Sequence, residues 1–151
     1  MRDQLVYSLS GKGAHMSFEE AVADFPVEAI NLKPQGLDYS FWHLVEHVRI
    51  CQWDILQFVI DPNHVSPEFP VGLWPAPDAE TDEAGWNRSI ELFKSDLAAV
   101  IELTQDPSIN LTSELPHAPG YTYLREVLLV IDHNAYHTGE LAILRQVEGL
   151  W

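Results

Sequence analysis

Three stretches with helical periodicity, separated by proline-rich segments, most constrain what this chain can fold into. All ten prolines of the chain fall outside residues 39–60, 81–105 and 123–147. Within these stretches apolar residues recur every three or four positions, which places them on one face of a helix. Because a proline inside a helix removes a hydrogen bond and clashes with the preceding turn, the proline-rich segments are expected to be connections. No stretch alternates polar and apolar residues convincingly enough to predict a strand.

Capping residues and helix breakers give the expected helix boundaries. Ser17 and Glu20 have the spacing of a capping box, Thr81 is the expected N-cap of the middle long helix, and Gly149 follows the last one. Five helices are therefore expected: residues 3–9, a short helix after Ser17, and residues 39–60, 81–105 and 123–147.

The connection after the first long helix is itself long, from Asp61 to Pro77. A helix of about 22 residues is roughly 33 Å long, and an extended linker of this size can span more than that. The linker can therefore run back along the molecule and leave the two helices that it joins parallel. This pattern predicts an all-α fold, a four-helix bundle with one long crossover connection and a short extra N-terminal helix. A length of 151 residues fits one such domain over residues 1–151.

The charge of the chain excludes one class of partner. Lys and Arg total 8 against 23 Asp and Glu, a formal net charge of -15, and no basic stripe is present. Such a surface repels phosphate backbones and anionic lipids, so no nucleic acid or membrane partner is expected. No apolar run could span a bilayer, and Met1 to Ser10 lack the features of a signal peptide. A single cysteine, Cys51, excludes an intrachain disulfide and suits a cytoplasmic location.

Four of the seven histidines form two His-x-x-x-His pairs on the first and last long helices. Residues four apart on a helix lie on the same face, so His133 and His137 can bind one ion. A third ligand must come from another helix, and His43 or His47 could supply it. The remaining histidines fall in expected loops and are interpreted as surface residues: His15, His64 and His117.

Helical phase favours His47 over His43 as the third ligand. The apolar positions of the first long helix centre between Leu44 and Val48. At about 100° per residue, His47 lies closer to that centre than His43 does. Spacing alone still leaves a second interpretation open, in which the paired histidines are hydrogen-bonded core residues.

Two motifs resemble those of a known family. The run from Phe41 to His47 resembles the second-helix signature of the DinB/YfiT superfamily, and the run from Asp132 to Glu140 is similar to its C-terminal His-x-x-x-His-x-Gly-Gln motif. The resemblance implies a four-helix bundle, often dimeric, with a divalent metal ion held by His47, His133 and His137. Glu140 stands where the family usually has glutamine. It could support the ion or be a surface residue, and Asp132 is interpreted as solvated.

The resemblance also implies a function. Three protein ligands leave coordination positions open, so a bound water or thiol would become more acidic. Relatives in the wider superfamily include enzymes that use a low-molecular-weight thiol. We therefore expect a metal-dependent enzyme acting on small molecules in stress or detoxification metabolism, similar to a thiol transferase and homodimeric. A metal-dependent hydrolase and a non-catalytic metal-binding or dimerisation bundle are the alternatives. Histidine nitrogens suit Zn, Ni and Fe alike, and no catalytic residue is identified.

Two further features have structural interpretations. The tryptophans are expected to fill the core or an interface. The proline-rich segment around Phe69 to Pro75 is interpreted as a stiff connector in preference to a segment that closes over the site.

Overall fold

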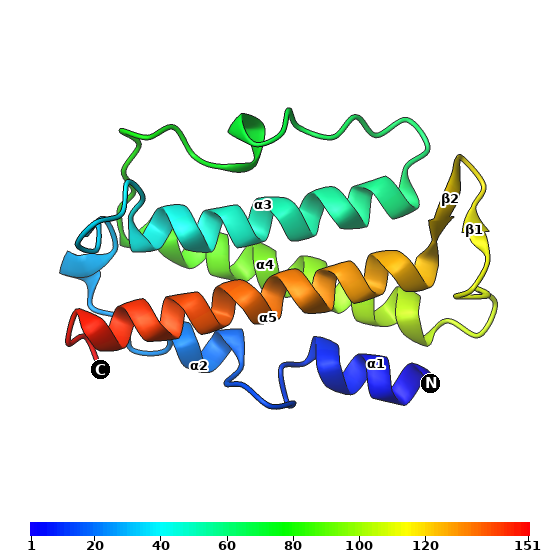
Figure 1. The fold of residues 1–151 in the computed structure, drawn as a ribbon, viewed down its shortest axis with the longest axis horizontal. Helices are drawn as coiled ribbons and strands as arrows, with labels where there is room; N and C mark the ends of the chain where they lie inside the picture. Colours follow the sequence, from blue (N-terminus) through cyan, green and yellow to red (C-terminus); the bar gives the residue numbers. More distant parts are fainter.

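The computed structural model describes residues 1–151 and is built mainly of α-helices (Figure 1). The elements, in chain order, are α1 (Arg2–Leu9), α2 (Phe18–Val22), η1 (Val27–Ala29), α3 (Phe41–Ile60), η2 (Val71–Leu73), α4 (Glu83–Gln105), β1 (Glu114–Leu115), β2 (Ala118–Thr122) and α5 (Tyr123–Val147), where η marks a 3-10 turn. The expected mainly helical fold is confirmed. No helix combines the length and the apolar character needed to cross a bilayer.

The three long helices lie side by side (Figure 1). Helix α3 packs against both α4 and α5, while α1 packs on α4 and α5, and α2 packs on α5. The chain between α3 and α4, residues 61–82, runs back along α3 on the side away from α1 and α2 (Figure 1). We call this segment the crossover. As a result α3 and α4 run parallel, and α5 runs antiparallel to both (Figure 1).

Helix α4 begins one residue later than expected, with Asp82 as its N-cap in place of Thr81. The Asp82 carboxylate accepts a hydrogen bond from Gly85 N at 2.9 Å. The backbone of Thr81 is held instead by the Asn31 side chain, which donates to Thr81 O at 2.7 Å and accepts from Thr81 N at 3.1 Å. This contact joins positions 50 residues apart, so the local sequence does not reveal it.

The expectation that the chain has no strand is wrong between α4 and α5. Strands β1 and β2 pair antiparallel, with a register shift between Glu114 and Leu115. Leu115 is buried beneath the hairpin, whereas most of β2 is exposed. Pro119 and Gly120 lie within β2 and obscure any alternating pattern. The pairing is therefore decided by cross-strand contacts, on which strand formation depends strongly.

Two groups of buried apolar side chains hold the helices together. One group joins α2, α3, α4 and α5 and includes Phe18, Phe41, Phe93 and Leu141. The other lies toward α1 and the hairpin and includes Leu5, Leu56, Val100, Leu111 and Val130. Because these groups pack α3 and α5 against each other over most of their length, they fix the separation of the side chains that face one another between these two helices.

Candidate metal centre

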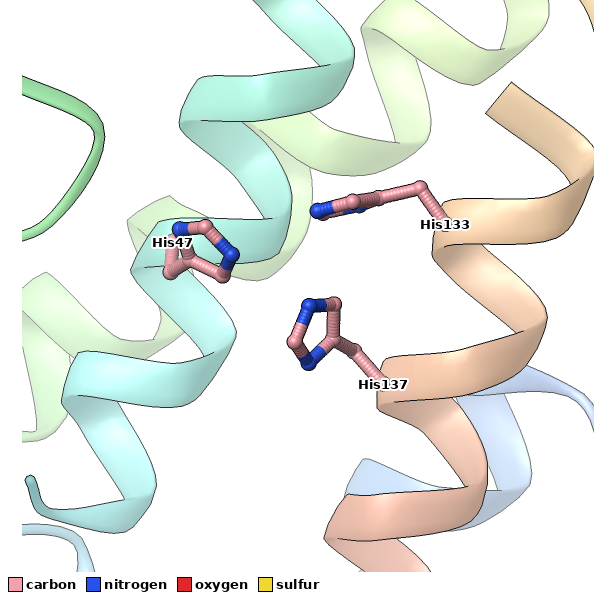
Figure 2. A group of neighbouring side chains, drawn as sticks. All are labelled: His47, His133 and His137. Carbon is pink, nitrogen blue, oxygen red and sulfur yellow. The ribbon is translucent and has the colours of Figure 1, made fainter. Parts of the chain in front are cut away.

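Three histidines from α3 and α5 point toward one another between the two helices (Figure 2). His47 comes from α3, and His133 and His137 come from successive turns of α5. One potential ligand atom from each ring lies within 4.8 Å of the other two. The structure thus brings together all three residues of the expected ligand set, and the group could hold a metal ion.

His47 is oriented by the crossover. Its Nδ1 donates a hydrogen bond to the carbonyl oxygen of Leu73 at 2.8 Å. The ring stacks on Trp74 with 3.8 Å between ring centroids and 5° between ring planes. A proton on Nδ1 leaves Nε2 with a free lone pair, the form in which imidazole binds a metal ion. Burial lowers the pKa of His47, so the ring is neutral at pH 7.

His137 is oriented by a carboxylate. Its Nδ1 lies 2.7 Å from Oε2 of Glu140, and the other oxygen of Glu140 accepts a hydrogen bond from the Tyr39 hydroxyl. Burial by itself would raise the pKa of Glu140, but the hydrogen bonds from His137 and Tyr39 lower it below its ordinary value. Glu140 is therefore ionised and contacts the ring of His137, which is the position that a group supporting the ion would take.

His133 has an unsatisfied nitrogen. Its Nδ1 is buried without a hydrogen-bond partner. Burial, together with the neighbouring His137 and His47, lowers the pKa of His133 to about 4. The ring is therefore neutral at pH 7, which is the form in which imidazole binds a metal ion.

The spacing of the rings also fits an ion. Three nitrogens bound to one zinc ion at about 2.1 Å lie roughly 3.4–3.6 Å apart. The ligand atoms here lie within 4.8 Å of one another. Each nitrogen would therefore move by up to about 0.7 Å to bind one ion, a shift that side-chain rotations supply.

His43 is not part of the cluster, although it is more buried than the phase argument predicts. It is 3% exposed. Its Nδ1 bonds to Ser40 in the capping box of α3, and its Nε2 donates to the Ala76 carbonyl at 2.9 Å. Both ring nitrogens are therefore used within the protein. The crossover covers this face of α3, which the periodicity of α3 alone could not reveal.

Two of the histidines interpreted as surface residues are half-buried and have partners. His64 Nε2 lies 2.6 Å from the Asp54 carboxylate, and His117 Nε2 donates to the Phe58 carbonyl at 2.7 Å. His15 is exposed, as expected, and so is Asp132. The earlier interpretation of His64 and His117 is wrong because the crossover and the hairpin pack against α3.

Sequence reasoning missed the contributions of Leu73, Trp74 and Tyr39. The crossover is more than the stiff connector that its prolines predict, because it supplies a carbonyl and an aromatic ring to His47. A tryptophan among the prolines of a connection was the one available signal. Cys51 is buried core, as expected, and burial raises the pKa of its thiol to about 12.

Two cavities lie near the three histidines, although none of the three lines either of them. A cavity of about 400 Å³ is lined by Tyr136 and Glu140, which both contact His137. A cavity of about 340 Å³ lies between α3 and α5 at the hairpin end, where Asp54 and Glu126 line it. These residues are seven positions from His47 and His133 respectively, which places the cavity about 10 Å along the helix axes from the cluster.

Fold and cluster together define a class of helical proteins in which side chains from two long helices converge on a place for one metal ion. The chain belongs to the DinB superfamily, because the model of this family matches residues 12–141, a span that includes all three histidines. The resemblance seen in the motifs is thereby confirmed. The comparisons found no similar curated protein and no similar solved structure.

Proposed function

We propose that this chain binds one divalent metal ion through His47, His133 and His137 and acts as a metal-dependent enzyme on small molecules. The convergence of the three rings carries the proposal, because one nitrogen of each lies within 4.8 Å of the other two. The Nδ1 atoms of His47 and His137 are already held by Leu73 and Glu140, so that their Nε2 atoms remain available. Zn, Ni and Fe all accept imidazole ligands, and the set does not choose among them.

The reaction class that we favour is transfer of a low-molecular-weight thiol to an electrophile. A bound divalent ion supplies Lewis acidity, which would lower the pKa of a thiol or water beside it. The chain's own contribution is to hold the ligands. Glu140 accepts from His137 and from the Tyr39 hydroxyl, so this carboxylate keeps the His137 ring in one tautomer. A metal-dependent hydrolase would use the same site with water in place of the thiol.

The cavity between Asp54 and Glu126 is where we place the body of the small molecule. Its volume of about 340 Å³ falls in the range of ligand sites. It is lined by residues of α3 and α5, the two helices that carry the histidines, so an elongated substrate bound there would have to extend along these helices to reach them. Leu129 lines the cavity one turn before His133, and a Leu129→Trp substitution should therefore block turnover without removing the metal.

A non-catalytic metal-binding bundle is the second candidate, and the burial of the cluster favours it. His47 is only 7% exposed, and the crossover covers it. The two candidates differ in what removal of the metal does. A structural ion contributes much of the folding free energy, so the metal-free protein would unfold. Removal of a catalytic ion would leave the protein folded but inactive.

We also propose that the chain forms a homodimer through α5, and that α1 and α2 together take the place of the fourth helix of the bundle. The outward face of α5 bears large exposed apolar side chains: Leu128, Tyr136, Ile143 and Val147. Exposed apolar side chains gathered on one helix often mark a contact with another protein. Light scattering of the protein and of an Ile143→Glu variant tests the dimer, since the variant should be monomeric.

Elemental analysis of the purified, tag-free protein tests the metal site. We expect about one equivalent of metal per chain, given one three-histidine set, and its loss in His133→Ala. A His43→Ala variant is the matched control, because His43 uses both ring nitrogens elsewhere and should leave the metal bound. Absence of metal from the wild type, even after addition of zinc, nickel or iron, would overturn the proposal. With metal confirmed, thiol-transfer and hydrolysis assays separate the enzyme candidates.

A further inference from the structure

Two consecutive crossover residues hold the ring of His47 from different directions. The hydrogen bond from Nδ1 to the Leu73 carbonyl, 2.8 Å long, fixes the rotation of the ring within its own plane. Stacking on Trp74, with ring planes 5° apart, fixes the tilt of that plane. Together these contacts leave His47 one orientation, and in this orientation the ring belongs to the three-histidine cluster (Figure 2).

Trp74 also connects to the opposite side of the cluster. Its ring packs on Tyr39, with 5.2 Å between centroids. Tyr39 donates to Glu140, which bonds to His137. The contacts therefore run from His47 on α3 to His137 on α5 without passing through the place of the ion. The two ligand-bearing helices are joined by this chain of side chains even before a metal binds.

The middle of the crossover has few other anchors. Three of its large apolar side chains face solvent: Val65 is 85% exposed, Phe69 82% and Val71 75%. Farther along, Ala76 and Thr81 are held by His43 and Asn31. Around residues 65–74, the contact of Leu73 and Trp74 with His47 is thus a principal attachment to the body of the protein.

We infer that Trp74 is a positioning residue for the metal ligand His47, and that metal binding and docking of the crossover at Leu73 and Trp74 stabilise each other. The inference rests on the proposed metal site. If the docked crossover already holds the His47 side chain in its binding orientation, less conformational entropy of that side chain is lost when the ion binds. By linkage, an ion that holds His47 in this orientation must hold the crossover in place to the same degree.

Substitution of Trp74 tests the first half of the inference. Zinc affinity is measured by competition with a chromophoric chelator, and ligand geometry by the visible absorption spectrum of bound cobalt(II). Loss of a contact that orients a metal ligand typically weakens binding about 10–100-fold. We expect a loss of this size and an altered cobalt spectrum in Trp74→Ala, with recovery in Trp74→Phe, which keeps an aromatic face against His47.

Trp53→Phe is the matched control. Trp53 also packs on a histidine ring, that of His64, with 5.3 Å between centroids, but His64 is outside the cluster. This variant should bind zinc and cobalt like the wild type.

Hydrogen exchange of the wild-type protein tests whether metal binding stabilises the docking of the crossover. Zinc should slow the exchange of backbone amides at residues 71–76 in the wild type and do so less in Trp74→Ala. This measurement in the wild type alone decides the coupling if Trp74→Ala fails to fold.

The outcomes separate the two proposals. A wild type that binds no metal overturns the proposed function and this inference together. Zinc affinity and a cobalt spectrum that are unchanged in a folded Trp74→Ala, or zinc that leaves the exchange of residues 71–76 unchanged, would overturn this inference and leave the metal site intact.

Discussion

The Nδ1 atom of His137 and the Oε2 atom of Glu140, one turn apart on α5, lie 2.7 Å from each other. The ionised carboxylate accepts a hydrogen bond from Nδ1–H of His137, so the opposite nitrogen of this ring keeps its lone pair for an ion. The C-terminal motif of the DinB superfamily, which this segment resembles, usually has glutamine at this position. This chain therefore places a negative charge beside the cluster, and the effect of that charge can be measured.

Glu140→Gln should weaken metal binding without abolishing it. Glutamine can still accept a hydrogen bond from His137, but it does not bring a charge that offsets that of the ion. We expect a loss of about tenfold in zinc affinity, the lower end of the effect of partners that orient a ligand. Chelator competition measures it, with the exposed Glu102→Gln on α4 as the control. Equal affinities of the Glu140→Gln variant and the wild type would show that the charge has no influence.

The metal-free protein should become less stable as the pH decreases, because His133 is protonated. Its pKa is about 4 in the folded protein and about 6.5 without the fold. The unfolded chain therefore binds the proton more readily. The contribution of the neutral ring is complete above pH 6.5 and is lost as the pH falls toward 4. The shift corresponds to about 1–3 kcal/mol of unfolding free energy once partial solvent exposure is considered.

Denaturant unfolding at pH 7.5 and pH 4.5 measures this loss. His133→Gln should lose less stability than the wild type over the interval, whereas His15→Gln, at an exposed position, should behave like the wild type. Equal losses in the wild type and His133→Gln would contradict the assignment of the low pKa to this ring.

His43→Ala should leave the metal in place and lower the stability of the protein. The His43 ring completes the capping box with Ser40 and donates to the carbonyl of Ala76. Removing a capping interaction costs about 0.5–2 kcal/mol, and the freed carbonyl adds to this loss. Thermal unfolding measures the change in stability, and elemental analysis measures the metal. Loss of metal in this variant would instead make His43 a ligand.

Arg145→Lys should destabilise the fold although the charge is kept. Arg145 is 3% exposed, and its guanidinium donates to the carbonyl oxygens of Ala21, Ala23 and Asp24 at the end of α2. A lysine cannot reproduce this planar set of donors. We expect a loss of about 2–4 kcal/mol, since hydrogen bonds to charged groups are worth about 1.5–3 kcal/mol each. Arg88→Lys, at an exposed position on α4, is the control. A loss below about 0.5 kcal/mol, the usual size of a surface substitution, would contradict the role of Arg145.

The sequence alone determined the features that depend on neighbours along the chain. The positions of α3 and α5 follow from apolar periodicity, with α5 as expected and α3 beginning at Phe41, two residues after the expected start, because Ser40 caps it. The pairing of His133 with His137 follows from the helical repeat, and the choice of His47 from phase and from the motif. Each of these signals lies within a few residues of the feature that it predicts, so tertiary contacts had little to change.

Only the tertiary structure decided how distant segments meet. The crossover covers His43, contacts His47 through Leu73 and Trp74, and is held at Thr81 by the side chain of Asn31. The hydrogen-bonded partners in these contacts are separated by 26 to 50 residues. No local propensity encodes them, because their free energy comes from surfaces that exist only when the helices have packed.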